Sequence, residues 1–118
     1  MNPAEKPDLS VLFRKSLSEG SGVLSGATIK NLTEYAEVHS AVLVIVETYR
    51  LKEGLEIPCP EYGISYPDYE AMCRNVGPRD CRRTMREAFD QLLMSMQAET
   101  DTFGFEVWFE TLAKISAH

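Results

Sequence analysis

Five arginine residues lie close together in this sequence and have the spacing of an anion-binding surface. They make up five of the twelve Lys and Arg residues in the chain: Arg74, Arg79, Arg82, Arg83 and Arg86. Because positions i, i+3, i+4 and i+7 share one face of an α-helix, the last four predict a stripe of guanidinium groups. The chain as a whole has a net charge of -6, so composition does not explain the cluster.

Apolar residues at helical spacing occupy the other side of the same segment, namely Cys81, Met85, Ala88, Phe89 and Leu92. A helix with this pattern packs its apolar side against a protein core and leaves its polar side exposed. The pattern therefore predicts an anchored helix that presents arginine side chains, and we place the function there.

Residues that could support catalysis or metal binding are few. The chain has two histidines, no nucleophile motif and no phosphate-binding glycine loop, so we expect no enzymatic activity and no cofactor. Cys59, Cys73 and Cys81 lack the paired spacing of a zinc site, so we expect no metal. An odd number of cysteines fits a reducing compartment better than a disulfide framework. Cys73 and Cys81 fall on predicted apolar faces, where a thiol serves as a small hydrophobe.

Length and composition indicate one soluble domain of 118 residues, with 44% hydrophobic and 25% charged residues. The longest apolar run, Ala41 to Val46, is far shorter than the roughly 18 residues of a membrane span. The first residues lack the apolar core of a secretory signal. We therefore expect a cytoplasmic protein, or a nuclear one in a eukaryote, with no membrane partner.

The amino-terminal third predicts an arm attached to a helical domain. Residues 1–8 contain two prolines and mixed charges and are expected to be disordered. A short amphipathic helix is predicted at about residues 9–18, followed by a Gly- and Ser-rich connection. We therefore expect an arm over residues 1–27 and the main domain over residues 28–118. The first helix could pack on its own domain or on a partner chain.

A long central helix is predicted from Thr28 to Lys52, because no helix breaker lies between Asn31 and Lys52 and Gly54 supplies a stop. The β-branched run from Ala41 to Val46 leaves a buried strand open as the alternative, and periodicity does not decide between the two.

Two further helices and a hairpin are predicted in the second half of the chain. A loop over 54–63 precedes a capping box at Ser65 to Asp68 and a short helix that ends near Arg74. After a turn at 75–78, the arginine helix starts near residue 79, with either Asp80 as its cap or Pro78 in its first turn, and ends between residues 93 and 96. Residues 94–99 either extend this helix or form a strand. With a turn at 100–104 and a strand at 105–112, that strand would make a terminal β-hairpin.

The segments Ile64–Met72 and Cys81–Phe89 resemble the winged helix-turn-helix superfamily, as found in bacterial, phage and plasmid regulators and replication proteins. In that pattern a Ser-capped helix and a turn precede a segment with paired arginines. Here Cys81 stands where a capping Ser is usual, and Gly77 to Asp80 lengthen the turn. The resemblance implies an α+β, mostly helical winged helix-turn-helix domain with a C-terminal β-hairpin.

The resemblance also implies a non-enzymatic, sequence-specific protein that binds double-stranded DNA and regulates transcription or replication. Arginine can bond guanine O6 and N7 in the major groove and can neutralise phosphates. Arg82, Arg83 and Arg86 are then expected to face the groove, with Thr84 at its edge, while Arg74 and Arg79 contact the backbone at the turn. One helix contacts little DNA, so we expect a homodimer on two half-sites.

Two other interpretations of the arginine stripe stay open. Such a stripe is often only a solvated helix face. It could also bind an acidic protein partner, in an adaptor or inhibitor of the kind that phages and plasmids encode. The net charge of -6 and the predicted wing tip, which has Asp101 but no Lys or Arg, both favour a protein partner.

Overall fold

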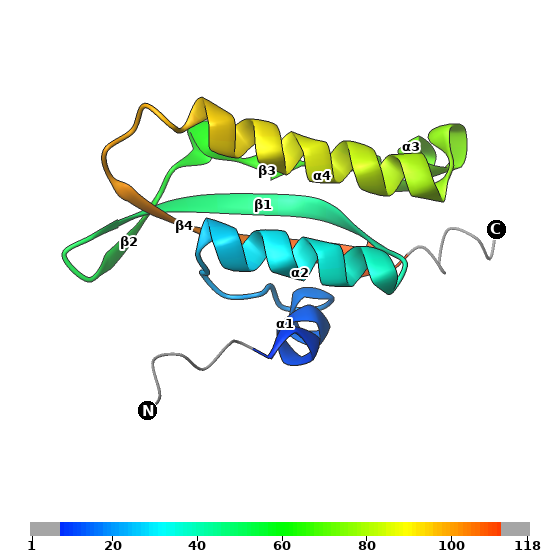
Figure 1. Ribbon diagram of the computed structural model, residues 1–118, viewed down its shortest axis with the longest axis horizontal. Helices are drawn as coiled ribbons and strands as arrows, with labels where there is room; N and C mark the ends of the chain where they lie inside the picture. The colour runs from blue at the N-terminus through cyan, green and yellow to red at the C-terminus, as the bar shows by residue number, and fades with distance from the viewer. Residues whose placement is uncertain (1–7, 112–118) are drawn as a thin grey trace.

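The computed structural model describes residues 8–111 as an antiparallel sheet with its two longest helices packed across one face (Figure 1). In Figure 1, α2 (Gly26–Val38) and α4 (Pro78–Ser95) lie side by side over the sheet and run in opposite directions. The predicted α+β class is confirmed. The predicted disordered start lies outside the described residues except for Asp8, whose carboxylate accepts backbone N–H bonds at the start of α1 (Leu9–Ser16).

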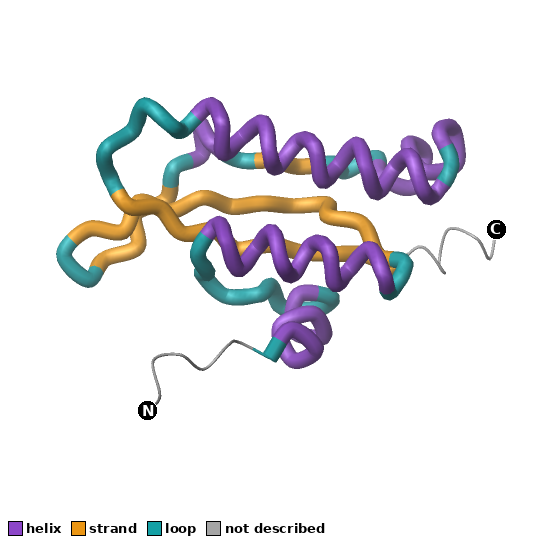
Figure 2. Tube along the Cα trace, in the orientation of Figure 1, coloured by secondary structure: helices purple, strands orange, loops and turns teal. Residues whose placement is uncertain are grey.

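A single long strand, β1 (Ala41–Lys52), organises the sheet. Along one edge it pairs first with β3 (Ile64–Ser65) and then with β2 (Leu55–Pro58), and along the other edge it pairs with β4 (Thr102–Thr111) over almost its full length. Figure 2 shows these strands, drawn in orange, meeting along β1 although they come from distant parts of the chain. A short 3-10 helix, η1 (Pro60–Tyr62), joins β2 to β3, so the predicted loop over 54–63 is partly ordered.

The prediction of one helix from Thr28 to Lys52 is wrong. Helix α2 ends at Val38, and the chain reverses at Ser40, which has a φ of 56°. The segment that follows is rich in β-branched residues, which suit strands better than helices. Because pairing is available on both of its edges, tertiary hydrogen bonding decides in favour of the strand.

The predicted C-terminal β-hairpin is also wrong within the described residues. Met94 and Ser95 extend α4, which ends within the predicted range, and β4 starts at Thr102, inside the predicted turn. Strand β4 pairs with β1 instead of with a neighbouring strand. The strand itself was predicted, and only its last residue, 112, lies outside the described part.

Helix α1 packs on its own domain, which was the first of the two alternatives. The Phe13 ring lies 5.6 Å from that of Tyr35 and 6.1 Å from that of Phe109. The Gly- and Ser-rich connection is tied to the sheet, because Ser21 N donates to Val107 O and Leu24 exchanges two backbone hydrogen bonds with Phe105.

Helix α3 (Tyr69–Val76) and α4 occupy the positions of the two predicted helices, with Pro78 in the first turn of α4. The predicted capping box is wrong, since Ser65 belongs to β3 and Asp68 makes no side-chain capping bond. A disulfide joins Cys73 to Cys81 across the turn between these helices. Our expectation that these two cysteines are free thiols is therefore wrong, and only Cys59 is free.

The core lies between the sheet and the helices. Its most completely buried side chains come from β1, β4, α2 and α4: Val42, Leu43, Val46, Val107, Phe109, Ile29, Leu32, Met85 and Phe89. None of the helices over residues 8–111 is both long enough and apolar enough to span a bilayer.

Candidate functional site

The four arginines of the stripe come together around one cleft. Arg79, Arg82, Arg83 and Arg86 of α4 line a hollow of about 330 Å³ with Glu37 of α2. We call this hollow the arginine cleft. It lies at the end of the helix layer where α4 begins and α2 ends (Figure 1). Of the predicted site residues, Arg74 and Thr84 do not line it.

The stripe points sideways toward α2 and not directly away from the core. Cys81, Met85 and Phe89 form the buried side of α4. Successive helical residues are rotated by about 100°, so the stripe lies about a third of a turn from that buried side. By the same geometry, Glu87 and Arg83 lie nearest the outermost side of α4, and Thr84 lies on the flank away from the rest of the stripe. All three are exposed.

Arg86 is held by a carboxylate from the neighbouring helix. Its Nη1 atom donates to both oxygens of Glu37, at 2.9 and 3.1 Å. The Glu37 side chain is 23% exposed and that of Arg86 is 40% exposed, so water screens this pair only in part. The pair fixes α4 against the end of α2 and neutralises one of the four guanidinium groups in the cleft.

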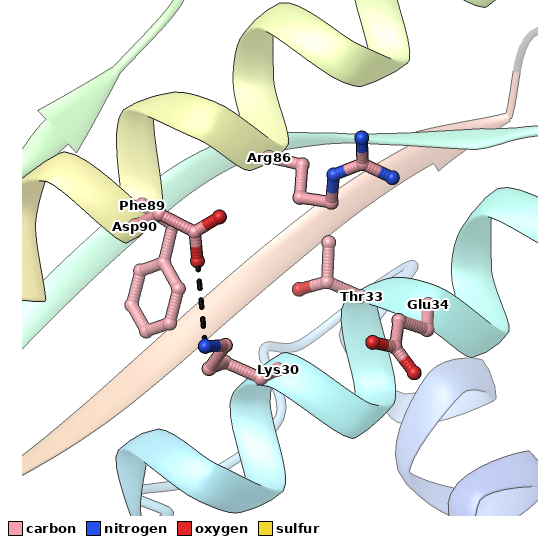
Figure 3. Close-up of a pocket in the computed structure, with 6 residues that line it drawn as sticks. All are labelled: Lys30, Thr33, Glu34, Arg86, Phe89 and Asp90. Carbon is pink, nitrogen blue, oxygen red and sulfur yellow. Dashed lines mark ion pairs between the residues drawn. The ribbon is translucent and has the colours of Figure 1, made fainter.

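A second hollow continues from the arginine cleft along the two helices. It has a volume of about 230 Å³ and is lined by Lys30, Thr33, Glu34, Arg86, Phe89 and Asp90. Figure 3 shows Lys30 of α2 and Asp90 of α4 facing each other, 3.8 Å apart, whereas the Glu34 carboxylate points away from α4. Arg86 lines both hollows, so the two are neighbours, and we call them together the groove between the helices.

Three of the predicted arginines already have carboxylate partners. Besides the pair at Arg86, Arg83 lies 3.2 Å from Asp80 and Arg74 lies 3.5 Å from Glu70. These last two pairs join neighbours on one helix and are about half exposed, so water and salt weaken them. Among the described residues, Arg79 and Arg82 have no carboxylate partner.

The arginine cleft is strongly cationic for its size. Four arginines and one glutamate line it, Asp80 partly offsets Arg83, and the first turn of an 18-residue helix adds the positive end of its dipole. Guanidinium groups bind carboxylates and phosphates through parallel hydrogen bonds. The cleft can therefore hold an anion with several oxygen atoms. Over residues 8–111, no three His, Cys, Asp or Glu side chains gather closely enough to hold a metal ion.

Sequence reasoning identified the arginines but missed the residues that complete the groove. Glu37 and Lys30 lie on the segment that was assigned to a long central helix, and the Arg86–Glu37 pair joins positions 49 residues apart. A single sequence carries no local signal for such a pair. Only the alternative of a strand at Ala41 would have placed the end of α2 next to α4.

Comparisons of the chain with protein-family models, with curated proteins and with solved structures found no match. The function is therefore argued from the site itself.

Proposed function

We propose that the protein is a non-enzymatic interaction module, an adaptor or inhibitor, that docks an acidic segment of a partner protein in the arginine cleft. One observation carries this proposal: four arginines of a single helix line a concave site together with one carboxylate residue, Glu37, and two of the four, Arg79 and Arg82, have no carboxylate partner among the described residues.

The geometry of the cleft suits carboxylates on a peptide. Each guanidinium group is planar and can bond both oxygens of one carboxylate. The Cβ atoms of arginines three or four residues apart on α4 lie about 5–6 Å from one another. Acidic residues three or four apart on a partner helix have the same Cβ spacing. The neighbouring hollow at Lys30 and Phe89 extends the groove, so a segment of several residues can lie between the helices.

The position of α4 within the helix layer supports a peptide ligand over duplex DNA. A major groove is about 12 Å wide and admits a single helix of about 10–12 Å diameter. Helix α2 lies alongside α4 and is joined to it by the Arg86–Glu37 and Lys30–Asp90 pairs. The two helices together are wider than the groove. The net charge of -6 also repels a polyanion such as DNA.

Sequence-specific binding of double-stranded DNA is the second candidate. It is favoured by Arg79 and Arg82, which lack carboxylate partners among the described residues. The sequence of the segments Ile64–Met72 and Cys81–Phe89, as noted above, also resembles the winged helix-turn-helix superfamily. In this case the predicted site residues would contact DNA phosphates and bases, namely Arg74, Arg79, Arg82, Arg83, Thr84 and Arg86. A homodimer would then regulate transcription or replication.

A binding titration with two labelled probes tests these proposals. A poly-glutamate peptide and a random DNA duplex are each titrated with protein at low and high salt, and fluorescence anisotropy is recorded. We expect the peptide to bind in a salt-dependent manner and the Arg79→Ala/Arg82→Ala variant to lose this binding. The matched control is Arg14→Ala/Lys52→Ala, which removes the same charge from two exposed residues that do not line the cleft.

The outcomes separate the two candidates. Tighter binding of the duplex than of the peptide, lost in the cleft variant, would favour the DNA regulator. If neither probe binds the parent protein at low salt, or if the control variant loses binding as fully as the cleft variant, the docking proposal is wrong.

A further inference from the structure

The face of the sheet away from the core carries two carboxylates side by side. In the register of β1 and β4, Val46 pairs with Val107, and both are buried. Side chains alternate between the two faces of a strand, so the next pair, Glu47 and Glu106, lies on the opposite face. Glu47 is exposed and Glu106 is half-buried. We call this pair the acidic pair.

Like charges directly opposite each other on two strands are unfavourable. Two hydrogen bonds offset part of this cost, since Tyr49 Oη donates to Glu47 at 2.9 Å and Gly22 N donates to Glu106 at 3.0 Å. The hydrogen bond to Glu47, burial, and then the charges of Glu47, Glu106 and Glu56 raise the pKa of the Tyr49 hydroxyl to about 12. Over residues 8–111 no Lys or Arg lies within ion-pair distance of the acidic pair.

The acidic pair matches the two free arginines of the cleft in charge and in spacing. Directly opposite residues on paired strands have Cβ atoms about 4.5–5.5 Å apart, and residues three apart on a helix about 5–6 Å apart. Arg79 and Arg82 are three apart and lack carboxylate partners among the described residues, so each could meet one carboxylate of an acidic pair on another molecule.

Apolar side chains border both surfaces. Ile45 pairs with Trp108 next to the acidic pair, and both are half-buried. At the cleft end of α2, Val38 is 81% exposed. Burying these side chains would add a hydrophobic contribution to the ion pairs.

We propose that the acidic partner of the arginine cleft includes a second copy of this chain, with Arg79 and Arg82 of one molecule paired with Glu47 and Glu106 of the next. This inference rests on the proposed function of the cleft. The two surfaces lie on opposite sides of the molecule, one in the helix layer and one on the outer face of the sheet. The contact is therefore head-to-tail and extends into chains, in contrast to the closed two-fold dimer expected from the sequence.

Sedimentation velocity over a range of protein concentrations at low salt tests the contact. We expect the average mass of the parent protein to rise above 13.3 kDa with concentration, to pass twice that value, and to return to monomer at high salt. The Arg79→Ala/Arg82→Ala variant and the Glu47→Gln/Glu106→Gln variant should each lose self-association. Glutamine keeps an acceptor for the Tyr49 and Gly22 hydrogen bonds, and circular dichroism checks that both variants are folded.

Mixing the two variants gives the decisive measurement. Each retains the surface that the other lacks, so an equimolar mixture should form dimers of twice 13.3 kDa and nothing larger. The Arg14→Ala/Lys52→Ala control, which removes the same charge away from both surfaces, should associate like the parent. A parent protein that stays monomeric, a mass that stops at the dimer, or variants that associate like the parent would each overturn the proposal.

The poly-glutamate titration distinguishes failure of this inference from failure of the proposed function. If the peptide binds the cleft while the parent protein stays monomeric, the cleft docks acidic segments but not its own copy. If the peptide does not bind either, both proposals fail. Where both hold, the peptide should compete for the cleft and dissociate the chains.

Discussion

Removing the charge of Glu37 should strengthen binding to the arginine cleft. This carboxylate already occupies one guanidinium group, at 2.9 and 3.1 Å from Arg86 Nη1, and an acidic ligand must compete with it. The Glu37→Gln substitution keeps the shape of the side chain and releases Arg86 from its ion pair. The cleft then has four guanidinium groups and no carboxylate.

The magnitude follows from the exposure of the pair. An exposed ion pair contributes about 0.2–1 kcal/mol, and a hydrogen bond to a charged group about 1.5–3 kcal/mol. With side chains 40% and 23% exposed, the Arg86–Glu37 pair lies between these cases, and we assign it about 1 kcal/mol after discounting for solvent screening. Since about 1.4 kcal/mol corresponds to tenfold in affinity, Glu37→Gln should bind the poly-glutamate peptide about fivefold more tightly.

The same substitution should reduce stability, because it weakens the link between α2 and α4. We expect the free energy of unfolding in urea to fall by about 1 kcal/mol. The control is Glu53→Gln, which removes the same charge from an exposed residue in the turn between β1 and β2, away from the groove. If Glu37→Gln binds the peptide no more tightly than Glu53→Gln does, Glu37 is not a competitor for the cleft and the reasoning is refuted.

Three further predictions concern the fold and the outer sheet face. Gly20→Ala should lower the free energy of unfolding by about 1–3 kcal/mol more than Gly54→Ala does. Both glycines have positive φ, but only at Gly20 would the new Cβ lie 2.7 Å from a carbon of the Trp108 indole. Equal losses of the two variants in urea titrations would contradict this close approach. Phe89→Ala should cost about 3–5 kcal/mol, since its ring is 1% exposed, and a loss below about 1 kcal/mol in the same titrations would show a looser core. Ultraviolet titration should show Tyr49 ionising near pH 12 in the parent protein and at lower pH in Glu47→Gln. The raised pKa also means that the stability contributed by this hydroxyl is full below pH 10.0 and is lost as pH rises toward 12, so a flat alkaline stability profile would count against the Tyr49–Glu47 hydrogen bond.

Local signals in the sequence were enough to place α1, α3, α4 and the last strand. Pro78 marks the start of α4 because proline fits the first helical turn and cannot continue a preceding helix. The apolar spacing of Cys81, Met85 and Phe89 indicates the buried side of the same helix, and all three are fully buried. These features depend on neighbours within a few residues, which a single sequence contains.

The errors arose where distant parts of the chain decide the structure. Ala41 to Val46 fits a buried helix or a buried strand equally well by periodicity, and pairing with segments up to residue 111 makes it a strand. The predicted hairpin failed for the same reason, since β4 pairs with β1. The competition of Glu37 for Arg86 depends in turn on where α2 ends, so it could not be anticipated once that end was misplaced.

The dependence of the sheet on β1 has a consequence for how the protein is made. During synthesis, β1 emerges well before β4, and until residues 102–111 have left the ribosome one whole edge of a strongly apolar strand lacks its hydrogen-bonding partner. Unpaired apolar edges recruit other chains and promote aggregation. Translation that terminates prematurely before Thr102 should therefore yield insoluble fragments instead of smaller folded proteins, even though every helix that lines the arginine cleft would already be complete.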